Sequence, residues 1–173
     1  RDLRMSRGLG DVYKRQTVCL AVPLYRQLTL LRKNLKAVVI GIVSGVLASM
    51  VSVLIFAKLF GLSHSEYVTL LPKSITTAIG MGVSEELGGL VTITVAVIII
   101  TGVLGNVIAE AVLKVAKIEE PIAKGLALGT SAHAIGTSKA MELGPVEGAM
   151  SSLAIAVAGL LTVIAASVFA GFM

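Results

Sequence analysis

LLPKSITTAIGMGVSEELGG, residues 70–89, and GLALGTSAHAIGTSKAMELGP, residues 125–145, are two copies of one broken, hydroxyl-rich segment. At an offset of 56 positions Ser74 matches Thr130, residues 78–80 match 134–136, and residues 86–88 match 142–144. Each copy is followed by a long apolar run. The sequence therefore contains an internal repeat of a broken segment plus a helix, and such a repeat sets the architecture.

The chain as a whole has the composition of a membrane protein. Of its 173 residues, 55% are hydrophobic and 14% are charged, and the mean hydropathy is +0.93. Three stretches without a charge, residues 37–57, 87–109 and 148–173, contain at least 21 residues each. At about 1.5 Å per residue, each can cross a hydrocarbon core of roughly 30 Å. We therefore predict an all-α, polytopic membrane protein.

The two repeated segments are apolar enough to enter a membrane but make poor continuous helices. The first contains Pro72 together with Gly80 and Gly82. In a helix interior, glycine costs about 1 kcal/mol and proline about 3 kcal/mol relative to alanine. Unwound backbone at membrane depth survives only where it is buried in protein or lines a wet cavity. We predict that both segments are discontinuous, re-entrant helices.

Basic residues indicate how these elements are oriented. The net charge is +5, and beyond residue 16 most basic side chains lie beside predicted spans, so nucleic acid is not an expected partner. They include Arg26, Arg32, Lys33 and Lys36 before the first span, and Lys114, Lys117 and Lys124 after the second. The positive-inside bias assigns both loops to the cytoplasm.

Two loops on one side require an even number of crossings between them, and two long spans already supply it. The first broken segment then enters and leaves from the outer side, and the second from the cytoplasmic side. Inverted repeats of this kind are typical of secondary transporters. Glu119 and Glu120 dilute the charge of the second loop, and if its assignment fails the repeat is parallel.

The N-terminal stretch differs from the rest of the chain. Residues 1–16 are aperiodic and lack the apolar core of a signal peptide. We predict that they are a leader foreign to the fold and that residues 17–173 form the transmembrane domain. The single cysteine, Cys19, excludes an intramolecular disulfide and is expected to pack in a span.

The broken segments carry the side chains that are candidates for ligand binding. Hydroxyls, an ammonium, an imidazole and N–H groups at helix starts are mainly donors, and a helix start adds about half a positive charge. This inventory suits an anion, and we predict a small carboxylate. The candidate substrate-binding residues are Lys73, Ser74, Thr76, Thr77, Thr130, Ser131, His133 and Thr137.

Each candidate also has a structural interpretation. An ionisable residue such as His133 in a membrane segment is costly and often functional, and it titrates near neutral pH, which suits proton coupling. It can instead bond a backbone carbonyl freed by the helix break. Lys73 can extend to the interface, and hydroxyls can bond their own helix backbone.

Other patterns have simpler explanations. Gly41, Gly45 and Ser49 lie on one helix face that admits a close neighbour. Glu86 and Glu142 recur at equivalent positions, either as a relay or as solvated interfacial residues. There is no metal-spaced His/Cys set, phosphate-binding glycine loop or Ser/His/Asp set. We therefore expect neither an enzyme nor a bound metal or cofactor.

The runs TVCLAVPLY (17–25), LLPKSITTAIGMGVSEELGG (70–89) and PIAKGLALGTSAHAIGTSKAMELGP (121–145) resemble the LrgB/CidB family of bacterial membrane proteins, which is related to a chloroplast glycolate/glycerate carrier. The resemblance extends over residues 17–173. It implies further spans before residue 17, so we expect an N-terminally truncated domain. It also implies proline at the position of Ala78, so we expect the helix to be less sharply interrupted there.

The resemblance implies two activities. Members are described as holin- or antiholin-like modulators of murein hydrolase activity and autolysis, beside a smaller LrgA/CidA-like membrane partner, and also as carriers of pyruvate, glycolate or glycerate. The repeat and its donors favour a secondary carrier of small monocarboxylates in the cytoplasmic (inner) membrane. The alternative is a holin-like pore or regulatory scaffold that forms a homo-oligomer and moves no specific solute.

Overall fold

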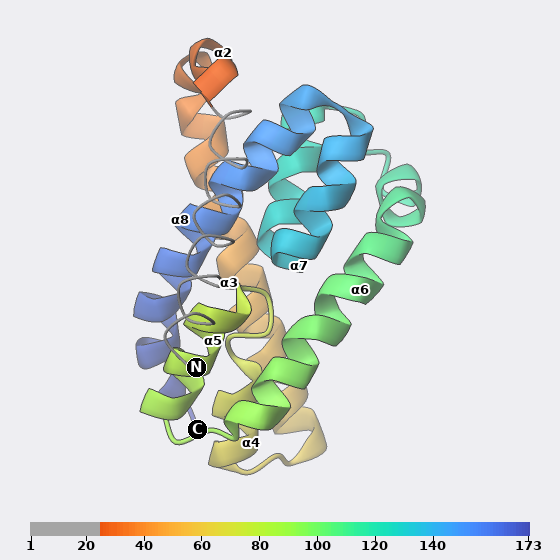
Figure 1. The fold of residues 1–173 in the computed structure, drawn as a ribbon. Helices are drawn as coiled ribbons and strands as arrows, with labels where there is room; N and C mark the ends of the chain where they lie inside the picture. The colour runs from red at the N-terminus through yellow and green to blue at the C-terminus, as the bar shows by residue number, and fades with distance from the viewer. Residues whose placement is uncertain (1–24) are drawn as a thin grey trace, which may run out of the picture.

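The computed structural model describes residues 25–173, and the regular elements of this part are all helices (Figure 1). They are α2 (Leu28–Lys33), α3 (Leu35–Phe60), α4 (His64–Leu70), α5 (Thr77–Glu86), α6 (Val91–Val115), α7 (Pro121–Leu143) and α8 (Pro145–Ala170). The predicted leader, residues 17–24 and Cys19 lie outside the described residues. The predicted all-α class is confirmed.

Helices α3, α6 and α8 are long and apolar enough to cross a membrane, with 26, 25 and 26 residues. They correspond to the three predicted spans. Helix α6 starts at Val91 rather than Leu87 and continues past Glu110 to Val115. Glu110 does not end the helix, because its carboxylate pairs with the Lys139 ammonium at 2.8 Å.

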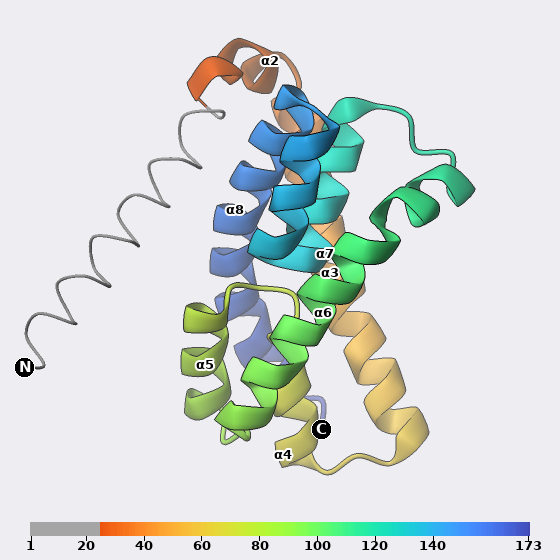
Figure 2. The ribbon, with the colours of Figure 1, turned by 45° about the vertical axis from the view of Figure 1, so that its right-hand side comes forward.

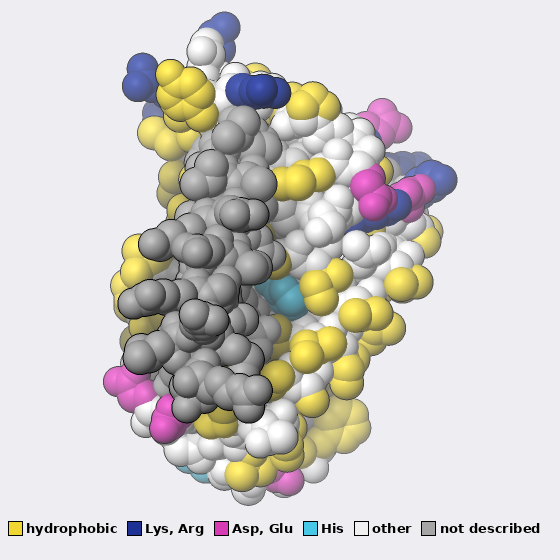
Figure 3. Space-filling view, in the orientation of Figure 1, with side chains coloured by type: hydrophobic (Ala, Val, Ile, Leu, Met, Phe, Trp, Pro, Cys, Tyr) yellow, Lys and Arg dark blue, Asp and Glu magenta, His cyan; other side chains and the backbone are white. Residues whose placement is uncertain are grey.

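The outer surfaces of the long helices are apolar. Exposed side chains include Ile40 and Leu59 on α3, Val107 on α6, and Leu160 and Ile164 on α8. Apolar surface in water is unfavourable by about 25 cal/mol per Å², so a bilayer is the solvent that fits these faces. Figure 3 shows basic side chains gathered at one end of the molecule, with hydrophobic side chains along the flank below them.

The first repeated segment forms a helical hairpin made of α4 and α5. Helix α4 begins with a capping box between Ser63 and Glu66, and the chain then turns at residues 71–76, around Pro72. Helix α5 returns to the start of α4, where the Ser65 hydroxyl donates to the Gly88 carbonyl oxygen at 3.1 Å. Gly80 and Gly82 lie inside α5 rather than at the break.

The second repeated segment folds back within α7. Residues Ala132 and His133 have non-helical backbone angles, with φ 42° and ψ −136° at His133. A Cβ atom added to Gly136 would lie 2.8 Å from the Leu128 carbonyl oxygen, whereas these residues are about 12 Å apart in a straight helix. At the repeat offset the break matches residues 76 and 77 of the first hairpin.

The two hairpins approach each other from opposite ends of the molecule (Figure 1 and Figure 2). The α4–α5 hairpin lies where α8 ends, and the Tyr67 hydroxyl donates to the Phe169 carbonyl oxygen at 2.9 Å. The two ends of α7 lie at the opposite end, where Lys124 and Leu143 line one pocket beside the end of α6. Helix α2 also lies at this second end, because Arg26 shares a pocket with the α7–α8 junction. The hairpins are therefore inverted relative to each other.

Candidate functional site at the hairpin tips

Helix α3 lies against the tips of both hairpins. A Cβ atom added to Gly45 would lie 2.7 Å from Thr130 Oγ1, so this glycine permits close approach of the second hairpin. One turn further along α3, the Ser49 hydroxyl oxygen lies 3.1 Å from that of Ser74 in the first hairpin. The matched repeat positions Ser74 and Thr130 therefore meet the same helix one turn apart.

Lys73 is a cation at the tip of the first hairpin, in the turn that Figure 2 shows near the middle of the molecule's long axis. Its Nζ atom donates to Ser74 Oγ at 2.9 Å. The salt bridges among residues 25–173 all belong to Lys139, which pairs with Glu110 and Glu142, so none involves Lys73. A lysine at the centre of a bilayer costs about 2.5–3.5 kcal/mol. A single charged hydrogen bond returns about 1.5–3 kcal/mol, and the ammonium carries two further donors.

Lys73 lines a pocket of about 440 Å³ between α6 and the first half of α7. Thr101 and Ser131 add hydroxyls to this lining, and most of its other side chains are aliphatic. The Ser131 side chain is exposed, and its hydroxyl donates to the Ala127 carbonyl oxygen at 2.6 Å. An apolar wall with a few convergent polar groups is typical of small-molecule sites.

Both return helices begin at the tips. Helix α5 starts at Thr77 after the N-cap Thr76, whose side chain makes no capping hydrogen bond. The return half of α7 starts after His133. The first N–H groups of a helix have no partner within it, and each start carries about half a positive charge. Thr76 and Thr77 are partly buried and follow Lys73 closely in the sequence, but neither of them lines the 440 Å³ pocket that Lys73 lines.

His133 is 3% exposed and packs against α6. Its Nε2 atom lies 2.9 Å from the Ile98 carbonyl oxygen, and a Cβ atom added to Gly102 would lie 2.6 Å from the same nitrogen. The carbonyl belongs to a neighbouring helix and not to the broken one. His133 does not line the 440 Å³ pocket, and its bond to α6 differs from the predicted bond to a carbonyl freed by the break.

Thr130 and Thr137 are buried and bonded within the protein. The Thr137 hydroxyl oxygen lies 2.7 Å from that of Ser151 on α8, and it donates to the His133 carbonyl oxygen at 3.0 Å. Thr130 donates to the Leu126 carbonyl oxygen at 2.8 Å. The Ser151 contact joins the second hairpin to α8, whereas the other two bonds lie within α7. Neither threonine lines the pocket that contains Lys73.

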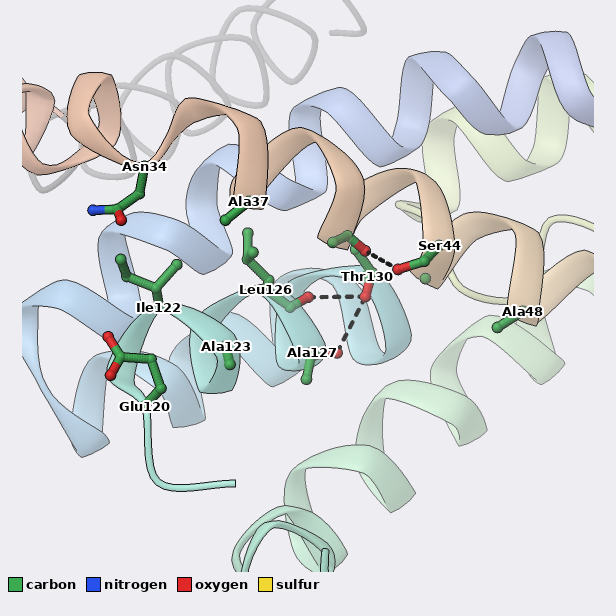
Figure 4. A pocket seen from close by; sticks show the side chains of 12 residues that line it. Asn34, Ala37, Ser44, Ala48, Glu120, Ile122, Ala123, Leu126, Ala127 and Thr130 are labelled. Atoms are coloured by element: carbon green, nitrogen blue, oxygen red, sulfur yellow. Dashed lines mark hydrogen bonds between the residues drawn. The ribbon is translucent and has the colours of Figure 1, made fainter. Parts of the chain in front are cut away.

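A second groove, of about 620 Å³, runs between α3 and the first half of α7 (Figure 4). Figure 4 shows Leu126 and Thr130 on α7 opposite Ala37 and Ser44 on α3. A Cβ atom added to Gly41 would lie 2.9 Å from Leu126 Cδ1. The small-residue face of the first span is thus covered by α7 of the same chain, as its packing interpretation expects.

Some polar contacts between α6 and the two hairpins go beyond the sequence-based prediction. Asn106 Nδ2 donates to the Ile135 carbonyl oxygen at 3.0 Å, which ties α6 to the return half of α7. Thr94 donates to Ser84 at 2.7 Å and so ties α6 to α5. Polar residues inside a predicted span mark such positions, but the spacing along one helix does not identify the partner on another.

Three apolar helices of spanning length, apolar outer faces and two opposed helical hairpins define an all-helical membrane protein. The sequence matches the model of the LrgB-like family over residues 9–172. The chain belongs to the LrgB-like family. This match begins within residues 1–16, which the sequence analysis predicted to be a leader. A transmembrane domain that starts at residue 17 stays a prediction.

Relatives of the chain carry holin-like and antiholin-like names. It is 42% identical over 145 residues to "Holin-like protein CidB" of Staphylococcus epidermidis, which covers 84% of this chain and 63% of that protein. It is 40% identical over 157 residues to "Antiholin-like protein LrgB" of Bacillus mycoides, and the match covers 91% of this chain and 68% of that protein. The uncharacterized protein YwbG of Bacillus subtilis is 38% identical over 165 residues, and the match covers 95% of this chain and 73% of that protein. The chain thus spans just under two thirds of the staphylococcal relative, and no solved structure matches it.

Proposed function

We propose that the chain forms the core of a secondary carrier for small monocarboxylates of the glycolate, glycerate or pyruvate type. In this proposal α3, α6 and α8 cross the cytoplasmic (inner) membrane of the cell, and the α4–α5 and α7 hairpins are re-entrant. The carboxylate binds at the tips, on the Lys73 ammonium and the N–H groups at the start of α5. No chemical step on the substrate is part of the mechanism.

The observation that carries the proposal is the environment of Lys73. Among residues 25–173 the Lys73 ammonium makes one hydrogen bond, to Ser74, and takes part in no salt bridge. A carboxylate supplies the opposite charge and two acceptor oxygens for the remaining ammonium donors. The other pocket side chains are mostly aliphatic, which fits a ligand with one ionised group better than a di- or tricarboxylate.

Movement of the first half of α7 offers a route to alternating access. This half-helix separates the 440 Å³ pocket from the 620 Å³ groove, and Ala127 lines both. In carriers with inverted repeats, one repeat rocks against the other around a fixed midplane site. We assign Thr130, His133 and Thr137 to holding this hairpin, and a proton-coupling role of His133 stays a prediction.

Uptake into proteoliposomes tests the carrier. The purified chain is reconstituted, and the initial rate of labelled pyruvate and glycolate uptake is measured against concentration. The proposal expects saturable uptake, and expects unlabelled substrate inside the vesicles to accelerate the entry of label by exchange. Uptake that is no faster than in protein-free vesicles overturns it.

The second candidate is a holin-like pore or regulatory scaffold, and the names of the relatives support it. It predicts release of a trapped dye without saturation, from a homo-oligomer or an assembly with an LrgA/CidA-like partner. The Gly41 face is covered by Leu126 of the same chain, so a pore would need another face for assembly. Release of dye by the chain alone, at a rate independent of carboxylates, would favour this candidate over the carrier.

A further inference from the structure

Ser49 on α3 belongs to the same hydrogen-bonded chain as Lys73. The Lys73 ammonium donates to Ser74 Oγ at 2.9 Å, and Ser74 Oγ lies 3.1 Å from Ser49 Oγ. Ser74 is 7% exposed, and Ser49 is partly buried. Because an ammonium has no acceptor, Ser74 must accept from Lys73, and its hydroxyl hydrogen is then available to Ser49.

The two repeats differ at these two positions in a coordinated way. At the offset of 56, Lys73 matches Gly129 and Ser49 matches Gly105. A Cβ atom added to Gly129 would lie 2.5 Å from the Ser151 carbonyl oxygen, and one added to Gly105 would lie 2.5 Å from Ala132 Cβ. Helix packing therefore leaves no room for a side chain at Gly105 on α6 or Gly129 on α7. The cation and the hydroxyl occur together on the first hairpin and α3, and both are absent from the matching positions on the second hairpin and α6.

We propose that Ser49 is a positioning residue for substrate binding, acting through Ser74 to fix the Lys73 ammonium at the mouth of the anion site. This inference rests on the proposed carrier function. A hydrogen-bonded chain in a low-dielectric site strengthens each of its members, and a lysine side chain has many rotamers to lose on binding an anion. Holding the ammonium in place before the substrate arrives lowers that entropic cost.

Substitution of Ser49 tests the assignment in the pyruvate uptake assay. We expect Ser49→Ala to raise KM about threefold to tenfold, the effect of one hydrogen bond in a binding site, while the maximal rate stays within about twofold. Ser49→Thr keeps the hydroxyl and should restore KM. The matched control is Ser52→Ala, because the Ser52 hydroxyl donates at 2.7 Å to the carbonyl oxygen of Ser49 in its own helix and not to the Ser74 chain.

Thermal unfolding in detergent identifies variants that merely fail to fold. The Lys73→Gln variant separates the proposed carrier function from the positioning role of Ser49. If wild type transports and depends on Lys73, but folded Ser49→Ala keeps the wild-type KM, the positioning role is overturned and the carrier stands. If wild type does not transport, the carrier itself fails. A rise in KM that Ser49→Thr does not reverse also contradicts the role, because it would show that helix packing, and not the hydroxyl, is responsible.

Discussion

The Nε2 atom of His133 lies 2.9 Å from the carbonyl oxygen of Ile98, which joins the break of the second hairpin to the middle of α6. The Ile98 side chain also lies against the first hairpin, because a Cβ atom added to Gly80 would overlap Ile98 Cδ1. One buried residue of α6 therefore contacts both repeats.

Replacing His133 should reveal how this contact and the backbone at the break contribute to stability. His133→Ala removes the bond to Ile98 and should lower the free energy of unfolding by about 1–3 kcal/mol. His133→Gly loses the same bond but suits the positive φ of this position, so it should be about 1 kcal/mol more stable than the alanine variant. Thermal unfolding in detergent gives the order wild type, glycine, alanine. An alanine variant as stable as the glycine variant would contradict the role of backbone strain.

Two glycines offer opposite outcomes for the same substitution. In Gly102→Ala the new methyl would lie 2.6 Å from His133 Nε2, and overpacking should cost about 1–3 kcal/mol. Gly82 lies inside α5 with no atom near its added Cβ, so Gly82→Ala should stabilise by about 0.5–1 kcal/mol. Both variants are compared with wild type by thermal unfolding. Equal effects would mean that His133 does not pack on Gly102.

The capping box of α4 predicts a pH effect at the α4–α5 end. Hydrogen bonds from the Ser63 side chain and backbone N–H hold the pKa of Glu66 below its ordinary value. A lowered pKa adds stability at pH values above the unfolded pKa of about 4.5, and this stability is lost as the pH falls through the folded value. Ser63→Ala should raise the pKa of Glu66, as followed by carboxyl NMR shifts, and should narrow the stability difference between neutral and acidic pH. An unchanged titration would show that the capping box is not formed.

The long spans were predictable because a run of about 20 uncharged residues has few alternatives to crossing a bilayer. The residues at which the spans begin and end were less predictable. The charge-free criterion stops before Glu110, yet α6 continues for another turn because Lys139, distant in sequence, pairs with that carboxylate. The Glu110–Lys139 pair depends on the tertiary structure, which a charge-free run in the sequence does not encode.

The repeat predicted that both segments would break but not which residues would form the break. In the second hairpin the break falls at Ala132 and His133, whereas Gly129 and Gly136 remain inside α7. These glycines serve close packing, since added Cβ atoms would meet Ser151 and Leu128. Contacts such as Ser49 with Ser74 depend on the register between two helices, which hydropathy does not encode.

Thiol labelling tests the opposed arrangement of the hairpins. After Cys19→Ser, single cysteines replace His64 and Glu86 at the ends of the first hairpin, and Glu119 and Glu142 at the ends of the second. An impermeant reagent should label the first pair from one side of oriented vesicles and the second pair from the other. Labelling of all four from one side would contradict the inverted repeat.

The dependence of pyruvate uptake on Lys73 tests the central claim most directly. Initial rates are compared for wild type, Lys73→Gln, Lys73→Arg and Lys139→Gln, each reconstituted at equal density after thermal unfolding has shown that it is folded. Lys73→Gln should raise KM at least tenfold, equivalent to about 1.4 kcal/mol, and Lys73→Arg should retain part of the affinity. Lys139→Gln should resemble wild type, because that lysine is already paired with Glu110 and Glu142. A folded Lys73→Gln variant that transports pyruvate with the wild-type KM would contradict an anion site at the hairpin tips.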